Sequence, residues 1–329
     1  MRLFLARIKD FLRSIVQFLT KDLWALDFSQ LSAARKRLFK SIQAFVLTAR
    51  GFGRERVGRE AIALSQFTLL AFVPILALLL FFASGYGLEK LLYDQLIGLF
   101  PTSTPMVESV TGYAKNIVKA TENGIFGWIS FLGFAWTVIW LMINVGIAFN
   151  RIWEVREPRK LWKRMVVYLL ILMVTPFVLL LFLSGWTWYA RFIGLLEGHL
   201  GAFGFITTNL FWFAFYGVVV LALTMMYKFI PHAKVRFGSA LKAALIVGVV
   251  FIGIQYLYME TQVFVTRLNA VYGALAFVPL LIIWMNLCWQ VILFGAELSR
   301  GYTLVDYREA KERGLTEKTA EEQVLTKLD

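Results

Sequence analysis

Long apolar runs dominate the pattern of hydrophobic and polar positions along this chain. Six runs, separated by polar or charged loops, fill about residues 60–84, 124–149, 165–189, 206–227, 240–260 and 274–298. Each approaches or exceeds the ~20 apolar residues that a helix needs to cross ~30 Å of hydrocarbon. The runs are apolar on all sides, unlike the amphipathic helices of soluble domains. The pattern predicts an all-α polytopic membrane protein, with six transmembrane helices in a domain over residues 60–298.

The region before this domain has a different pattern. Residues 1–59 are predicted to be cytoplasmic, and apolar residues recur at helical spacing over the first twenty positions. This spacing predicts a basic amphipathic helix, which either lies on the membrane surface or packs on the protein's own cytoplasmic face. A second helix is predicted at about 33–49, before Gly51 and Gly53 break the chain. One side of that helix is apolar and carries Leu38, Ile42, Phe45, Val46 and Ala49.

Two further segments are polar. Residues 85–123 are long for a connection and are predicted to form two short helices, about 88–99 and 105–120, in an external cap. Residues 299–329 form a charged cytoplasmic tail that is poor in apolar residues. We therefore expect this tail to be mobile and to form helix weakly.

Composition agrees with the membrane assignment, and the placement of charge orients the chain. Hydrophobic residues make up 59% of the sequence, and the net charge is +13. Of 34 Lys and Arg residues, those in the predicted outer segments are Lys90, Lys115, Lys119, Arg191 and Arg267. Such an asymmetry predicts cytoplasmic termini. The basic residues lie at membrane borders, where anionic headgroups attract them, so we expect no nucleic-acid partner.

Residues for catalysis or metal binding are scarce. Cys288 is the single cysteine, and His199 and His232 fall on opposite sides of the membrane in the predicted topology. The sequence lacks G-x-S-x-G, Walker A and H-E-x-x-H motifs. We therefore expect neither an enzyme nor a cofactor or metal site.

Polar residues inside the spans are the strongest functional signal. Asn286, Gln290 and Glu297 are spaced by 4 and 7 residues, which places them on one helix face. Stripes on several spans could line one aqueous cleft. The alternative role for each amide is a hydrogen bond between helices, and Glu297 could instead pair with Arg300 or Arg151. The candidate path residues are Gln66, Asn144, Gln255, Asn286, Gln290 and Glu297.

A dense basic cluster follows the second span. Its cations could gather anionic lipid headgroups at the inner leaflet. The candidates for this role are Arg151, Arg159, Lys160, Lys163 and Arg164.

Three stretches resemble the YihY/BrkB family of bacterial membrane proteins, once labelled ribonuclease BN. They are residues 59–76, including Pro74; Asn150-Arg-Ile-Trp153 with its basic loop; and the segment from Phe229-Ile-Pro231 through Val271–Ala276 to Gly295-Ala-Glu297-Leu. The resemblance covers about residues 35–300. It implies six spans, cytoplasmic termini, and a connection to envelope integrity, serum resistance and export of lipids or small solutes. The nuclease label has no support, because a nuclease needs clustered Asp and His metal ligands.

Two hypotheses follow for function. The first is a transporter or flippase-like protein for a lipid or small solute. The second is a non-transporting scaffold that recruits envelope partners through the cap at residues 85–123. Expected partners are membrane lipids and envelope proteins, and a homo-oligomer is compatible with the sequence.

Overall fold

The protein is all-α throughout the part of the chain that its computed structural model describes. The described residues are 17, 22–24, 32–54, 57–84, 124–155, 204–268 and 270–312, with positions 90, 93, 108–109, 111–112, 115–116 and 119. The long helices are α2 (Ala33–Arg54), α3 (Val57–Ser84), α6 (Ile125–Ile152), α8 (Gly204–Phe229), α9 (Phe237–Leu268) and α10 (Ala270–Glu312), and the 3-10 helix η1 (Asp22–Trp24) precedes them.

Several of these helices match predicted spans. Among the described residues, the stretches long and apolar enough to cross a membrane are Val57–Leu78, Leu132–Ile152, Phe237–Thr261 and Val278–Glu309. A shorter apolar stretch, Phe215–Phe229, coincides with the predicted fourth span. The predicted third span, at 165–189, lies outside the described residues. So do the predicted first helix, apart from Gln17, the end of the tail from residue 313, and most of the cap.

The described positions of the cap are helical. Tyr93 donates a hydrogen bond of 3.2 Å from its hydroxyl to the Glu108 carboxylate. This bond joins one predicted cap helix to the other.

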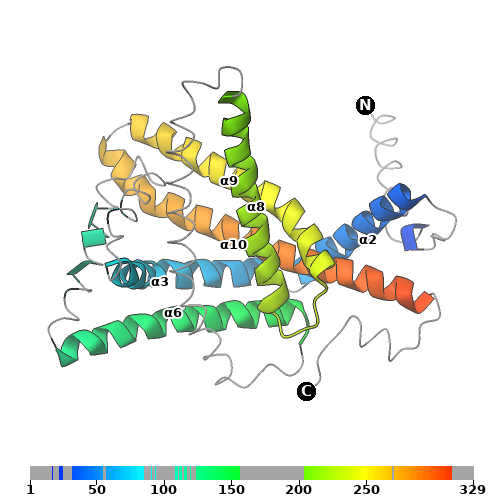
Figure 1. The fold of residues 1–329 in the computed structure, drawn as a ribbon, viewed down its shortest axis with the longest axis horizontal. Helices are drawn as coiled ribbons and strands as arrows, with labels where there is room; N and C mark the ends of the chain where they lie inside the picture. Colours follow the sequence, from blue (N-terminus) through cyan, green and yellow to red (C-terminus); the bar gives the residue numbers. More distant parts are fainter. Residues whose placement is uncertain are drawn as a thin grey trace, which may run out of the picture.

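Helix α10 organises the bundle. Its 43 residues extend for about 64 Å at 1.5 Å per residue, roughly twice the hydrocarbon thickness. It contacts α2, α3, α6, α8 and α9. In Figure 1, α3, α6, α9 and α10 run alongside one another, α8 crosses them, and α2 projects with the C-terminal part of α10 from one end of the bundle.

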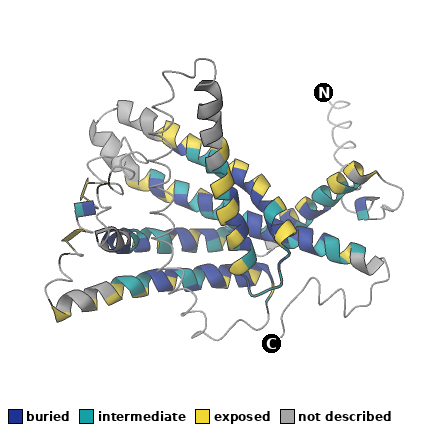
Figure 2. Cartoon of the chain, viewed as in Figure 1, coloured by how far each residue is buried: buried dark blue, intermediate teal, exposed yellow. Residues whose placement is uncertain are grey.

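The largest buried cluster lies toward that same end. It includes Phe149 of α6, Tyr227 of α8 and Leu293 of α10, all fully buried. Gly295 makes this packing possible, because a Cβ there would collide with the Tyr227 hydroxyl group. Figure 2 shows buried positions continuing along α10 to the part that α2 crosses.

The prediction of a mobile tail from residue 299 is wrong for its first part. Helix α10 continues without a break to Glu312. Ser299, Tyr302, Thr303 and Val305 are buried in this extension. Their burial follows from α2, which packs against α10 and removes an otherwise polar helix from water.

The apolar side of the second helix is only partly buried. Leu38 and Phe45, on its predicted apolar side, are 59% and 52% exposed, whereas Gln43, Ala44 and Thr48 are buried. Nor does Gly51 break the helix, since α2 continues to Arg54. Small and polar residues of α2 are thus buried against α10, while the exposed Phe45 contacts α10 through the ring of Phe294, with ring centroids 5.7 Å apart.

Close approach of two backbones explains why small residues of α2 are buried here. A Cβ at Gly301 of α10 would lie 2.8 Å from the Ala44 carbonyl oxygen of α2, and a Cβ at Gly51 would collide with the Glu297 carboxylate. Bulky side chains such as Leu38 cannot fit between helices at this separation. Small residues line the contact for the same reason that they line close helix pairs in membranes.

We predict that Gly301→Ala destabilises the contact between α2 and α10 by about 1–3 kcal/mol, the usual cost of overpacking. Tryptic cleavage within α2 should then become faster, because local opening exposes its backbone. Gly253→Ala in α9 is the matched control, since no atom lies within 4 Å of its added Cβ. Equal cleavage rates in the two variants would contradict the close-approach explanation.

Candidate functional site

The C-terminus of α6 ends in a Schellman motif. The Val155 amide donates to the Asn150 carbonyl and the Glu154 amide to the Arg151 carbonyl, both at 3.0 Å. Glu154 has a φ of 50°, a left-handed conformation that glycine usually supplies. A residue with a side chain pays roughly 1–2 kcal/mol to adopt this backbone conformation. We therefore infer that the Glu154 carboxylate makes a stabilising contact.

That contact is an ion pair with α10. Arg300 lies 2.7 Å from the Glu154 carboxylate and 3.4 Å from the Glu297 carboxylate. Arg151 pairs with Glu60 at the start of α3. These five residues, which we call the charged junction, connect α3, the end of α6 and α10 at one end of the bundle.

A neutral hydrogen bond extends the junction to the α8–α9 turn. Asn150 is buried, and its side-chain oxygen accepts a hydrogen bond of 2.7 Å from the His232 backbone amide. The stretch Asn150–Glu154 therefore holds three parts of the chain that are distant in sequence. The sequence contains no glycine here, so it gave no signal of the left-handed residue.

Glu297 occupies the most enclosed position of the junction. It is 4% exposed and lies beneath α2, where Gly51 leaves room for its carboxylate. Of the two cations proposed as its partner, the one in contact is Arg300. A carboxylate buried at the edge of a membrane span is a functional-site candidate by default.

The polar pair of α10, Asn286 and Gln290, lies on the N-terminal side of Glu297 in the same helix. The Gln290 side-chain amide donates a hydrogen bond of 2.6 Å to the Asn286 side-chain oxygen, and both residues are half-buried. A hydrogen bond between helices comes instead from a neighbouring residue. The Trp289 indole donates a hydrogen bond to the Thr68 hydroxyl of α3 at 2.9 Å. The sequence carries no signal of this contact, because neither residue belongs to a polar stripe.

The other path candidates form no described hydrogen bond with one another or with this pair. Gln66 is exposed on α3, and Gln255 is half-buried on α9. Asn144 donates a hydrogen bond of 2.8 Å to the Trp140 carbonyl of its own helix. The described hydrogen bonds therefore bring together Asn286 and Gln290 from the predicted set, and a common cleft stays a prediction.

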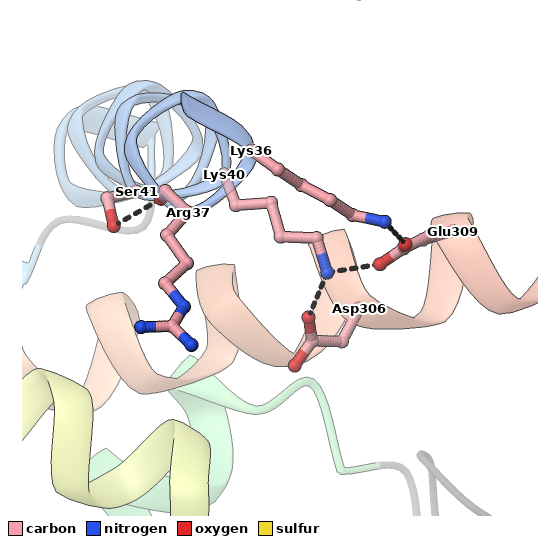
Figure 3. Close-up of polar contacts among 6 residues, drawn as sticks. All are labelled: Lys36, Arg37, Lys40, Ser41, Asp306 and Glu309. Carbon is pink, nitrogen blue, oxygen red and sulfur yellow. Dashed lines mark hydrogen bonds and ion pairs between the residues drawn. The ribbon is translucent and has the colours of Figure 1, made fainter. Parts of the chain in front are cut away.

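A second ionic cluster fastens α2 to the extension of α10. Lys40 pairs with Asp306, at 3.0 Å, and with Glu309, which also pairs with Lys36. Figure 3 shows the two lysines of α2 directed at the two carboxylates of α10. We call these four residues the α2–α10 lock. Burial opposes ionisation of Lys40, but hydrogen bonds to Glu309 and Asp306 outweigh it and raise the lysine's pKa.

The 3-10 helix η1 adds to the lock. Gln43 donates a hydrogen bond of 2.8 Å to the Leu23 carbonyl. Arg308 donates to the Trp24 carbonyl at 3.1 Å and lies over the Trp24 ring. Leu23 is fully buried by these contacts.

The predicted headgroup cluster is described at one position. Arg151 is exposed but paired with Glu60, so its charge is partly used within the protein. Arg159, Lys160, Lys163 and Arg164 lie outside the described residues. In the part of the chain that the structure describes, no group of three or more His, Cys, Asp or Glu side chains is placed to hold a metal ion.

The three stretches that resemble the YihY/BrkB family each contribute a residue to the charged junction. Comparison with known sequences agrees with this resemblance. A profile of the family described as Virulence factor BrkB matches residues 48–322. The chain belongs to this family. The match contains the whole charged junction and the α10 side of the lock, while Lys36 and Lys40 precede it.

Other members of the BrkB family are membrane proteins by name. A UPF0761 membrane protein of Laribacter hongkongensis is 32% identical over 262 residues, which are 75% of this chain and 58% of the relative. One from Pseudoalteromonas translucida is 28% identical over 254 residues, 72% of this chain and 78% of the relative. This chain thus spans less than two thirds of the Laribacter protein. No solved structure matches it.

We predict that Glu154→Ala destabilises this BrkB-family protein more than Glu154→Gly does. Both substitutions remove the ion pair with Arg300, but glycine also relieves the left-handed backbone, which alanine does not. The expected difference is about 1 kcal/mol. Thermal melting of detergent-solubilised protein, followed by tryptophan fluorescence, would measure it. An alanine variant as stable as the glycine variant would argue against strain at this residue.

Proposed function

We propose that this chain is an inner-membrane transporter or flippase-like protein for a lipid or small solute, with a role in envelope integrity. Both termini are cytoplasmic in this proposal, so the charged junction and the lock face the cytosol. The basic asymmetry of the sequence supports that orientation. No catalytic step is included.

The main support for this proposal is the polar pair of α10. Asn286 and Gln290 lie within the candidate span Val278–Glu309, where amides are costly unless they meet polar groups or water. Each amide offers two donors and an acceptor oxygen. Their shared hydrogen bond leaves most of this capacity unused by the described residues. Water or a polar substrate group would complete it.

Measurement of transport by the purified protein in liposomes would test this proposed function. Asn286→Leu with Gln290→Leu should lower lipid scrambling or solute efflux by about tenfold, the equivalent of one lost hydrogen bond of about 1.4 kcal/mol. Thr261→Val is the matched control, because Thr261 is exposed and its hydroxyl bonds to the Leu257 carbonyl of its own helix. This control should keep full flux.

Unchanged flux in the double variant, with normal folding, would rule out these amides as part of the path. Absence of flux in the unmodified protein would favour the alternative scaffold, which recruits envelope proteins through residues 85–123. Deletion within that segment should then cause an envelope defect.

The orientation has its own test. A reporter that is active in the cytoplasm, fused after Asp329, should be active, and a reporter that requires export should be silent. The opposite pattern would place the basic end of the bundle outside and contradict the proposed topology.

A further inference from the structure

Positive charge gathers at the turn between α8 and α9 without acidic residues nearby in sequence. Lys228 ends α8, Lys234 and Arg236 lie in the turn, and Lys242 lies in the second turn of α9. From Lys228 to Met259 the sequence contains no Asp or Glu. Any compensation of this charge must therefore come from elsewhere in the protein or from outside it.

Four other cations at this end of the bundle meet carboxylates within the protein. Lys36 and Lys40 pair with α10 across the lock. Arg151 and Arg300 each pair with a carboxylate of the charged junction. These side chains hold helices together, which leaves less of their charge for a ligand.

Lys228 and Lys242 have a different environment. The Lys228 ammonium lies 5.5 Å from the centre of the Phe229 ring and 5.3 Å from that of Phe237. The Lys242 ammonium lies 5.5 Å from the centre of the Tyr302 ring. Within the described residues, neither ammonium forms an ion pair with a carboxylate. Aromatic rings position a cation and attract it weakly, but they carry no net charge to neutralise it.

The turn lies at a membrane border by its position in the chain. The apolar stretch of α8 ends at Phe229, and the candidate span of α9 begins at Phe237. Both phenylalanines are exposed, as aromatic residues at the membrane interface are. Lysines at such positions extend their ammonium groups to the headgroup level.

We infer that Lys228 and Lys242 bind the phosphate groups of anionic phospholipids. The exposed rings of Phe229 and Phe237 contact the acyl region while the ammonium groups contact the headgroup. This site differs from the basic loop after α6, and it does not depend on transport. Its chemistry selects a net negative headgroup over a zwitterionic one.

The experiment compares two lipids on the full-length, detergent-solubilised protein. Native mass spectrometry gives apparent dissociation constants for dioleoyl phosphatidylglycerol and dioleoyl phosphatidylcholine. The unmodified protein should prefer phosphatidylglycerol. Lys228→Gln with Lys242→Gln should weaken phosphatidylglycerol binding by about thirtyfold, or about fivefold per lysine, and leave phosphatidylcholine binding unchanged.

Two further variants separate this site from general effects of charge. Lys115→Gln removes a lysine that is also exposed and also lies over an aromatic ring, that of Tyr93 at 5.6 Å, and it should bind phosphatidylglycerol normally. Lys228→Arg with Lys242→Arg should retain binding, which shows that the loss is one of charge and not of fold. Equal binding of the two lipids by the unmodified protein, or normal phosphatidylglycerol binding by the glutamine variant, would overturn the inference.

Discussion

A charged side chain at the centre of a membrane helix costs about 2.5–3.5 kcal/mol in insertion free energy, and this cost explains the layout of the bundle. No charged residue occurs in the stretches 61–84, 125–150, 243–259 and 270–296. Charges enter at the helix ends, and where they become buried they find partners. Glu297 lies beside Arg300, and Lys40 lies between two carboxylates. The apolar middle and the ionic end are thus two results of one constraint.

Helix α2 shows how ionic contacts and close packing of small residues modify the usual rule for surface helices. Its face toward α10 carries Lys36, Lys40, Gln43 and Thr48, while Leu38 and Phe45 are exposed. In a soluble protein the apolar side would be buried. Here the extension of α10 offers small residues and carboxylates, so the complementary face of α2 is small and basic. The chemistry of the partner helix therefore contributes to the choice of the buried face, together with the apolar contacts of Phe45 and Phe52 with Phe294.

The spans could be predicted from sequence because their signal is local: length and hydropathy suffice, whichever way each side chain points. Orientation and partners depend on residues far away in the chain. Nothing near Ala44 indicates that Gly301 will approach it, and nothing near Lys36 indicates Glu309. The left-handed Glu154 lacks the usual glycine, so no motif could reveal it. Spacing placed Asn286 near Gln290 because both lie on one helix, whereas the contact of Trp289 with Thr68 required the packing of two helices.

The continuity of α10 has a mechanical consequence. One unbroken rod joins the ionic extension, held by α2 at Asp306 and Glu309, to the amides at Asn286 and Gln290 inside the bundle. Between these two regions, Glu297 of α10 lies close against Gly51 of α2. A displacement of the extension, from a bound molecule or from loss of its ion pairs, would therefore be transmitted along α10 toward these amides. The lock and the polar pair are in this way mechanically coupled through a single helix.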